Sequence, residues 1–159
     1  MSHSITRETL DNEIDRLCEL FNQGYVAQVL SQATELLKNF PDSVALNIIK
    51  GDASTKLHKF DAAIASYAHA IKLKPDFAVS HFNLGVALQD KGDFESAIQS
   101  YKKAIALRPN YLSAYYNLAI SFGKIGFLEN SVKYFLEAIR LNPYHYSSWN
   151  NLLFPLHIL

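Results

Sequence analysis

Four of the five prolines in the chain recur at equal intervals, at Pro41, Pro75, Pro109 and Pro143. A fixed period of this length indicates that one small supersecondary unit is copied along the chain. Each copy then packs mainly against its neighbours, so the predicted fold is a stacked array and not a globule around one central core. A chain of this kind presents long surfaces, which favours a role in binding over a role in catalysis.

The prolines set the phase of the repeat, and each repeat is taken to end shortly after its proline. The sequence then predicts four repeats, preceded by a short extension and followed by one terminal helix. The extension is 1–9, the repeats are 10–43, 44–77, 78–111 and 112–145, and the terminal helix, a partial fifth repeat, is 146–159.

Each repeat reads as two helices joined by a tight turn, most clearly in 78–111. Apolar residues recur at helical spacing from Phe82 to Leu88. Gly92 then stands where the first helix should end in a left-handed residue, and Asp93 follows as a plausible N-cap of the second helix. Pro109 ends the second helix, because the residue before a proline is pushed out of the helical region.

Small and large residues alternate in columns that recur with the period of the prolines. The small column of the first helices is Gly51, Gly85 and Ala119, and the large column of the second helices is Tyr67, Tyr101 and Phe135. Small positions opposite large ones let the ridges of one helix enter the grooves of the next. These columns therefore predict helix–helix packing and carry no direct function.

This pattern resembles the tetratricopeptide repeat family. The resemblance covers residues 10–159 and is carried by the proline period, the glycine turn, the Asn-Leu-Gly motif at 83–85 and the recurring alanines Ala70, Ala104 and Ala138 of the second helices. It implies an all-α fold in which antiparallel helix pairs stack into a right-handed superhelical solenoid. The first helices of the repeats would line a concave groove, and the second helices would form the outer wall.

The sequence departs from the pattern at several places. Leu17 and Leu36 replace small residues in the first repeat, which predicts looser or differently angled packing there. His58 stands where the other three turns have glycine, so it should adopt a left-handed backbone at a cost of about 1–2 kcal/mol. Pro155 lies inside the terminal helix, which it should kink or end.

Composition narrows the class of protein. With 15 basic and 15 acidic residues among 159, the net charge is zero, which argues against nucleic acid as a partner. No apolar stretch approaches the length of a membrane span, so no membrane partner is expected, and the N-terminus shows no secretory signal. The single cysteine, Cys18, fits a reducing compartment, and we expect a cytoplasmic protein.

No catalytic motif is present in the sequence. It contains no phosphate-binding glycine loop, no nucleophile elbow and no zinc-protease motif, and its six histidines show no metal-ligand spacing. We therefore expect no enzymatic activity, no metal and no cofactor. Cys18 has no signature of a nucleophile and is predicted to be a small thiol in the core.

An asparagine column suggests a function. Asn83, Asn117 and Asn151 recur with the same period on first helices, and the resemblance to the family places them in the groove. A carboxamide offers a donor and an acceptor, so a ladder of them could hold an extended peptide backbone whatever its side chains. This arrangement resembles the asparagine ladder in the superhelix of O-linked N-acetylglucosamine transferase. The alternative is that asparagine is simply common at this repeat position.

The neighbouring groove positions are apolar and aromatic. The predicted lining is Phe82, Val86, Tyr116, Ile120, Ile48, Ile49 and Asp52. The carboxylate clamp of chaperone cofactors needs lysine and arginine on these faces, and in its place stand Ile48, Asp52, Asn83, Ser113 and Asn117. The predicted partner is therefore a protein or peptide held in an extended form, with an acidic C-terminal tail a poor candidate.

The end of the chain is apolar. Trp149, Leu152, Leu153 and Phe154 lie where a solenoid normally carries a polar cap. One interpretation is self-association into a homo-oligomer or scaffold. The other is that the chain is the non-catalytic arm of a longer enzyme, since arrays of the resembled family often precede glycosyltransferase or sulfotransferase domains.

Overall fold

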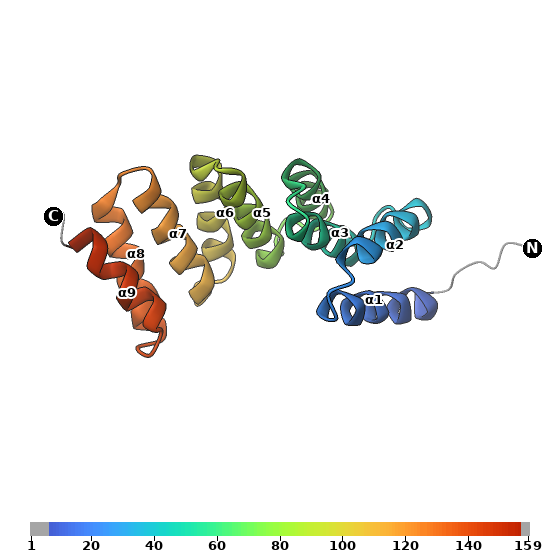
Figure 1. Ribbon diagram of the computed structural model, residues 1–159, viewed down its shortest axis with the longest axis horizontal. Coiled ribbons are helices and arrows are strands. Elements are labelled where there is room, and N and C mark those ends of the chain that lie inside the picture. Colours follow the sequence, from blue (N-terminus) through green and yellow to red (C-terminus); the bar gives the residue numbers. More distant parts are fainter. Residues whose placement is uncertain (1–6, 157–159) are drawn as a thin grey trace, which may run out of the picture. The chain divides into compact units, whose positions relative to one another are not determined.

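The computed structural model describes residues 7–156, with side chains for residues 9–153, and this part of the chain is all helical, without strands (Figure 1). The helices in chain order are α1 (Arg7–Asn22), α2 (Val26–Asn39), α3 (Val44–Lys56), α4 (Phe60–Leu73), α5 (Ala78–Lys91), α6 (Phe94–Leu107), α7 (Leu112–Lys124), α8 (Leu128–Leu141) and α9 (Tyr146–Leu156). The predicted all-α fold class is confirmed.

The chain forms two compact bodies, each described by itself. The N-terminal body, Met1–Pro75, contains α1 to α4, and the C-terminal body, Asp76–Leu159, contains α5 to α9. Within each body, consecutive helices pack against each other, as expected for helix–turn–helix repeats. Alternate helices also touch: α1 contacts α3, α5 contacts α7, and α7 contacts α9. The odd-numbered helices thus form one layer of each body.

The turn between α5 and α6 shows why the helices end where they do. Gly92 has φ 92°, a left-handed conformation that costs glycine nothing, and Asp93 N donates to Leu88 O across the turn. The Asp93 side chain then accepts from Ser96 N at 3.1 Å, which satisfies one of the open donors at the start of α6. The predicted glycine turn and N-cap are both present.

His58 occupies the corresponding turn between α3 and α4. Its φ is 56°, and no other non-glycine residue in the described part of the chain has a positive φ. The predicted left-handed histidine is therefore confirmed. Its ring stands edge-on to Phe60 at 5.7 Å between centroids, a contact that partly offsets the backbone strain.

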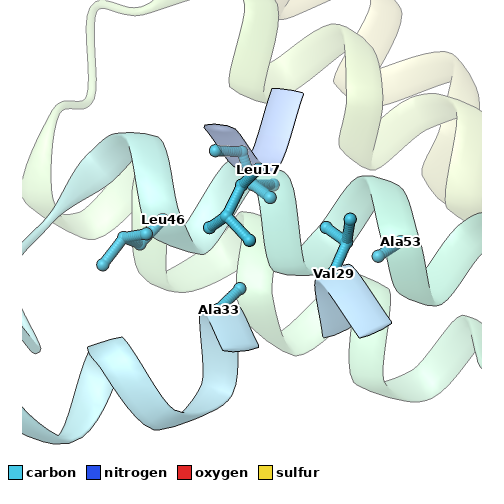
Figure 2. Packing of buried hydrophobic residues seen from close by; sticks show 6 residues of the cluster. Leu17, Val29, Ala33, Leu46 and Ala53 are labelled. Carbon is cyan, nitrogen blue, oxygen red and sulfur yellow. The ribbon is translucent and has the colours of Figure 1, made fainter. Parts of the chain in front are cut away.

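The core of the N-terminal body forms around α1, α2 and α3. Leu17, Val29, Ala33, Leu46 and Ala53 are fully buried and pack together, as Figure 2 shows. Leu17 fills the position that a small residue has in the later repeats. Leu36 is only partly buried and borders the same cluster.

The core of the C-terminal body follows the small and large columns. Tyr101 is fully buried against Gly85, and Phe135 packs with Ala119. Leu152 of α9 joins this second cluster, so the terminal helix is docked on the body. Helix α9 is described as far as Leu156, so it does not end before Pro155. Among the described residues, no helix is both long and apolar enough for a membrane span.

Candidate functional site

The layer formed by α5, α7 and α9 carries most of the residues predicted to line a groove. Asn83 and Val86 are partly buried on α5, as are Asn117 and Ile120 on α7, and Asn151 lies exposed on α9. Because α7 touches both neighbours, the three parts of the asparagine column lie on adjacent helices of one body.

Asn117 belongs to a polar network beneath this face. Its amide lies near the hydroxyl of Tyr101, where it acts to lower the pKa of that tyrosine, and the hydroxyl donates to Gln89 Oε1 at 3.3 Å. The hydroxyl of Ser121 donates to the same Gln89 oxygen at 2.9 Å. The network ties α5, α6 and α7 together beside the Asn117 side chain.

Asn151 is held by a different tyrosine. Its Nδ2 donates to Tyr116 Oη and to Ser147 O, both at 2.9 Å. Both amide protons are thus used within the body, and Oδ1 remains as the acceptor. Tyr116 itself is wedged between the rings of Phe135, at 5.8 Å, and His145, at 5.1 Å.

A cavity of about 210 Å³ opens beside Asn151. It has apolar walls and a polar rim, and its lining is Ile120, Gly123, Lys124, Leu128, Ser131, Phe135 and Asn151. Ser131 is almost fully buried there. Sequence reasoning found Ile120 and Asn151 but not the α8 residues, because α8 was predicted to form only the outer wall.

Phe82 is less available than the sequence suggests. Its ring packs between those of Tyr111, at 4.8 Å, and Tyr101, at 5.8 Å. The guanidinium of Arg108 lies over the Tyr111 ring, 4.8 Å from its centroid. Phe82 therefore contributes to an aromatic cluster that stiffens the face.

The remaining predicted groove residues lie in the N-terminal body, on α3. Ile48 is partly buried, Ile49 is nearly buried, and Asp52 accepts a hydrogen bond of 2.6 Å from Tyr67 Oη. Tyr67 also lies 3.4 Å from Thr55 Oγ1. Asp52 is thus anchored from the core side.

Cys18 was predicted to be a core thiol, and this prediction is wrong. Cys18 is exposed, because Leu17 occupies the inward position of α1 and the next residue is turned by about 100° around the helix. Cys18 lines a cavity of about 280 Å³ together with Phe21, Asn22, Ile49 and Asp52. Sequence reasoning missed Phe21 and Asn22 because the first repeat matched the pattern poorly.

The residues predicted for self-association divide into three groups. Trp149 and Leu153 are 46% and 55% exposed on α9. Leu152 is 4% exposed and belongs to the core, so it offers no surface. The side chain of Phe154 lies outside the described residues.

Over the described residues, no three histidine, cysteine, aspartate or glutamate side chains gather in a group that could hold a metal ion.

Solved structures with the same fold cover most of the chain. MamA residues 41-end from Desulfovibrio magneticus RS-1 match with a TM-score of 0.85 and 19% identity, covering 98% of this chain and 85% of that one. The first TPR of Spaghetti (RPAP3), bound to the HSP90 peptide SRMEEVD, matches with a TM-score of 0.71 and 23% identity, covering 72% and 91%. The Arabidopsis OM64 TPR domain matches with a TM-score of 0.70 and 21% identity, covering 73% and 96%. A comparison with curated protein sequences finds no significant match.

Family profiles match the repeats directly. A profile described as TPR repeat matches residues 51–92 and 88–126, and one described as tetratricopeptide repeat matches residues 112–145. The matched segments run without a gap from residue 51 to residue 145 and include Pro75, Pro109 and Pro143. The chain therefore belongs to the tetratricopeptide repeat family.

Proposed function

We propose that this protein is a non-catalytic interaction module that holds an extended segment of a partner protein against the face formed by α5, α7 and α9. The observation that carries the proposal is the pair of amides, Asn117 and Asn151, each beside a tyrosine hydroxyl, to which Asn151 donates at 2.9 Å. Side chains fixed before binding lose little rotamer entropy when the partner arrives, which favours affinity.

The chemistry of the face fits a polypeptide backbone. Asn151 keeps its Oδ1 as an acceptor for a backbone N–H, because both its amide protons are already used. The cavity beside it has apolar walls from Ile120, Leu128 and Phe135, and could take an apolar side chain of the same segment. Lys124 at its rim adds one cation for a nearby acceptor.

The relatives agree with this type of role. One of them, the first TPR of Spaghetti, was solved with a bound peptide. That peptide is acidic, whereas the face described here offers amides, aromatic rings and aliphatic side chains. We therefore infer a ligand that is read mainly through its backbone and one apolar anchor.

The test begins with a random peptide library displayed on phage, from which binders to the whole chain are selected. The tightest peptide is then labelled, and its affinity is measured by fluorescence anisotropy for the parent and for Asn117→Ala and Asn151→Ala. We expect each substitution to weaken binding by about three- to tenfold, as one lost hydrogen bond of about 1 kcal/mol implies. Gln99→Ala, an exposed amide on α6, is the matched control and should leave the affinity unchanged.

Thermal unfolding of each variant shows whether the fold is retained. Unchanged affinity in both folded asparagine variants would exclude the amide pair as the binding element. Binding that responds to Gln99→Ala would instead move the site to the outer helices.

A second candidate function is self-association through α9. Tyr146, Trp149 and Leu153 recur at helical spacing and expose apolar surface. The indole Nε1 of Trp149 donates to Pro143 O at 3.0 Å, so its polar atom is satisfied and its ring is open for packing. Gly85 of α5 and Ala119 of α7 occupy the same repeat position as Leu153. Each of them is covered by the second helix of its own repeat.

Sedimentation equilibrium at several concentrations tests this second candidate. A dimer that dissociates in Trp149→Ser with Leu153→Ser, and persists in Tyr25→Ser on the exposed N-terminal turn, would support it. A strict monomer at all concentrations would exclude it.

A further inference from the structure

The cavity beside Asn151 exists because the fourth repeat has smaller side chains at its inner positions than the third repeat. Three of the residues that line it differ in this way from their equivalents: Gly123 stands in place of Gln89, Leu128 in place of Phe94 and Phe135 in place of Tyr101. The cavity that remains has a volume of about 210 Å³. An apolar cavity of about 150 Å³ already takes a benzene molecule, so there is room here for one aromatic ring.

In the earlier repeats, the equivalent space holds a tyrosine hydroxyl and a polar partner. Tyr101 Oη of the third repeat donates to Gln89 Oε1 at 3.3 Å. In the second repeat, Tyr67 Oη lies 3.4 Å from Thr55 Oγ1. The fourth repeat has phenylalanine and glycine at these two positions, so neither the hydroxyl nor its partner is present. The cavity therefore replaces a tyrosine-centred contact that two other repeats make internally.

One polar group on the cavity wall has nothing to bond. Ser131 is 2% exposed and lines the cavity, whereas Ala63 and Ala97, its equivalents in the second and third repeats, are fully buried alanines. Within the described part of the chain, the Ser131 hydroxyl has no hydrogen-bond partner. A Cβ atom on Gly123 would lie 3.2 Å from Ser131 Oγ, so this hydroxyl faces the space that the glycine leaves open. A ligand that brings a hydroxyl to this point would satisfy a nearly buried polar group.

The mouth of the cavity matches a single peptide unit. Asn151 offers Oδ1 as an acceptor, because its Nδ2 already donates to Tyr116 Oη and to Ser147 O. Lys124 is exposed at the rim, and no described residue holds its ammonium group in an ion pair or hydrogen bond. A backbone N–H can therefore donate to Asn151 while the carbonyl oxygen of the same residue accepts from Lys124. The side chain of that residue then enters the cavity.

We propose that this cavity binds a tyrosine side chain of the partner protein, with its ring against Leu128 and Phe135 and its hydroxyl bonded to Ser131 Oγ. Tyrosine joins an apolar ring to a polar tip, and a buried tyrosine hydroxyl needs a partner, which Ser131 supplies. Phenylalanine leaves the serine unpaired, lysine is repelled by Lys124, and a glutamate carboxylate would lie between apolar walls. The inference rests on the proposed function, because it names the anchor residue of the segment held at that face.

The experiment compares two short peptides that differ only in one hydroxyl group. Both are acetylated, amidated and made of alanine and serine, and one carries tyrosine where the other carries phenylalanine. Titration of the tyrosine peptide into the ¹⁵N-labelled whole chain, followed by NMR, should shift the amide signals of Gly123, Ser131 and Asn151. The phenylalanine peptide should bind at least about fivefold more weakly, because it lacks one hydrogen bond to a site built for it.

Three variants locate the effect, with thermal unfolding as the check on their fold. Ser131→Ala should remove the preference for tyrosine and leave the phenylalanine peptide unchanged, and alanine already stands at this position in two repeats. Ser100→Ala is the matched control, because this buried serine of α6 donates to Ser96 O at 3.0 Å within its own helix, and it should keep the preference. Gly123→Gln puts the side chain of the third repeat into the cavity and should abolish the response to both peptides.

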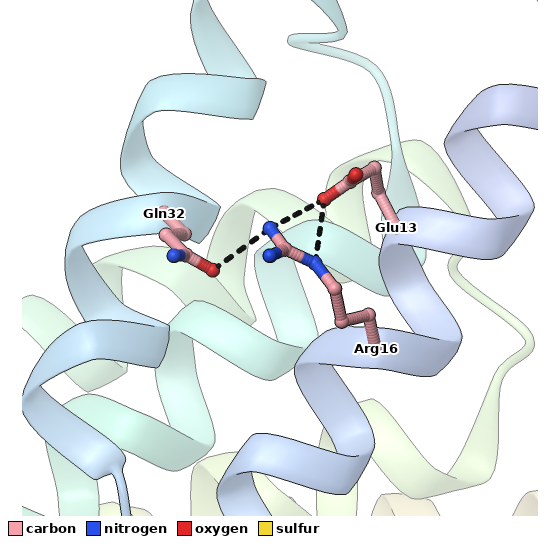
Figure 3. A network of polar contacts seen from close by, with 3 residues as sticks. All are labelled: Glu13, Arg16 and Gln32. Atoms are coloured by element: carbon pink, nitrogen blue, oxygen red, sulfur yellow. Dashed lines mark hydrogen bonds and ion pairs between the residues drawn. The ribbon is translucent and has the colours of Figure 1, made fainter.

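A phenol ring can also stack on an exposed guanidinium, so a further control addresses the arginines. Arg16 of α1 donates to Glu13 Oε2 at 2.7 Å and to Gln32 Oε1 of α2 at 3.2 Å, as Figure 3 shows. Because its guanidinium is engaged in this way, Arg16→Gln should leave the affinity for both peptides unchanged. A tyrosine preference that disappears in Arg16→Gln would place the ring on the N-terminal body and overturn the proposal.

Equal affinity for the two peptides, a tyrosine preference that survives Ser131→Ala, shifts confined to other residues, or no shift up to the solubility limit would each overturn the proposal as well. Asn151→Ala should weaken both peptides by the same factor and keep the ratio of their affinities. That common loss reports on the amide contact of the proposed function, whereas the ratio reports on the tyrosine anchor, so either can fail without the other.

Discussion

Gly85 of α5 lies so close to Tyr101 of α6 that a Cβ atom on the glycine would stand 2.5 Å from Cε1 of the ring. No unstrained carbon contact is that short, so the ring is seated where a side chain would otherwise be. The same relationship joins Gly51 and Tyr67 in the N-terminal body. In each case the glycine lets the tyrosine hydroxyl reach the face of the first helices.

We expect Gly85→Ala to destabilise the C-terminal body by about 1–3 kcal/mol, because Tyr101 must move although alanine favours the helix. Urea unfolding followed by circular dichroism measures the change. Gly123→Ala is the matched control, since its Cβ would meet only the Ser131 side chain, with the hydroxyl oxygen at 3.2 Å. That variant should be unchanged or more stable by up to about 1 kcal/mol, and equal destabilisation of both would contradict the explanation.

We expect His58→Gly to stabilise the N-terminal body by up to about 1 kcal/mol. Glycine removes the strain of φ 56°, while the added chain entropy and the lost contact with Phe60 offset part of the gain. The reciprocal change, Gly92→His at φ 92°, should cost about 1–2 kcal/mol. Urea midpoints decide both, and a loss of stability in His58→Gly would show that the ring contact outweighs the strain.

The sequence predicts the fold well because its strongest signals are local and periodic. Gly92, Asp93 and the left-handed His58 follow from the turn chemistry of one repeat, applied to the others in phase. The Gly85–Tyr101 contact follows from small and large columns on paired helices. Each of these predictions needs only the repeat period and the steric properties of single residues.

The candidate site could be predicted only in part. The position of Asn117 follows from the period, but the network of Tyr101, Gln89 and Ser121 beside it depends on how three helices meet. The cavity beside Cys18 was missed for a related reason. Leu17 stands where the later repeats have a small residue, so the repeat pattern does not show which face of α1 points to the core. Where a bulky residue replaces a small one, the sequence alone does not show which neighbour turns outward.

The polar network beneath the α5 and α7 face predicts strong coupling between two residues. Tyr101→Phe and Ser121→Ala each remove one donor to Gln89 Oε1, and each should cost about 1 kcal/mol. The double variant leaves that oxygen without either donor, so its cost should exceed the sum by at least about 0.5 kcal/mol. A double-mutant cycle from urea unfolding measures the excess.

Tyr101→Phe combined with Ser66→Ala of α4 provides the control for that cycle. Ser66 Oγ donates within its own helix to Ala62 O, at 2.8 Å, and shares no partner with Tyr101. The two costs should therefore add. Additive costs in the Ser121 cycle as well would mean that Gln89 is satisfied in another way.

Alkaline pH should weaken the C-terminal body through Tyr101. Burial raises the pKa of Tyr101 far above its ordinary value, the charge of Asp90 raises it further, and the hydrogen bond from Asn117 opposes them. An unfolded tyrosine ionises near pH 10, so above about that pH the folded state keeps a proton that the unfolded state releases. This contribution to stability is complete below about pH 10 and falls as the pH rises, by up to about 1.4 kcal/mol per unit.

Urea midpoints between about pH 8 and pH 11 should therefore fall more steeply for the parent than for Tyr101→Phe. Tyr144→Phe is the control and should follow the parent, because the Tyr144 side chain is exposed and takes no part in the core. Parallel curves for the parent and Tyr101→Phe would show that water reaches the hydroxyl from the face on which a partner is proposed to bind.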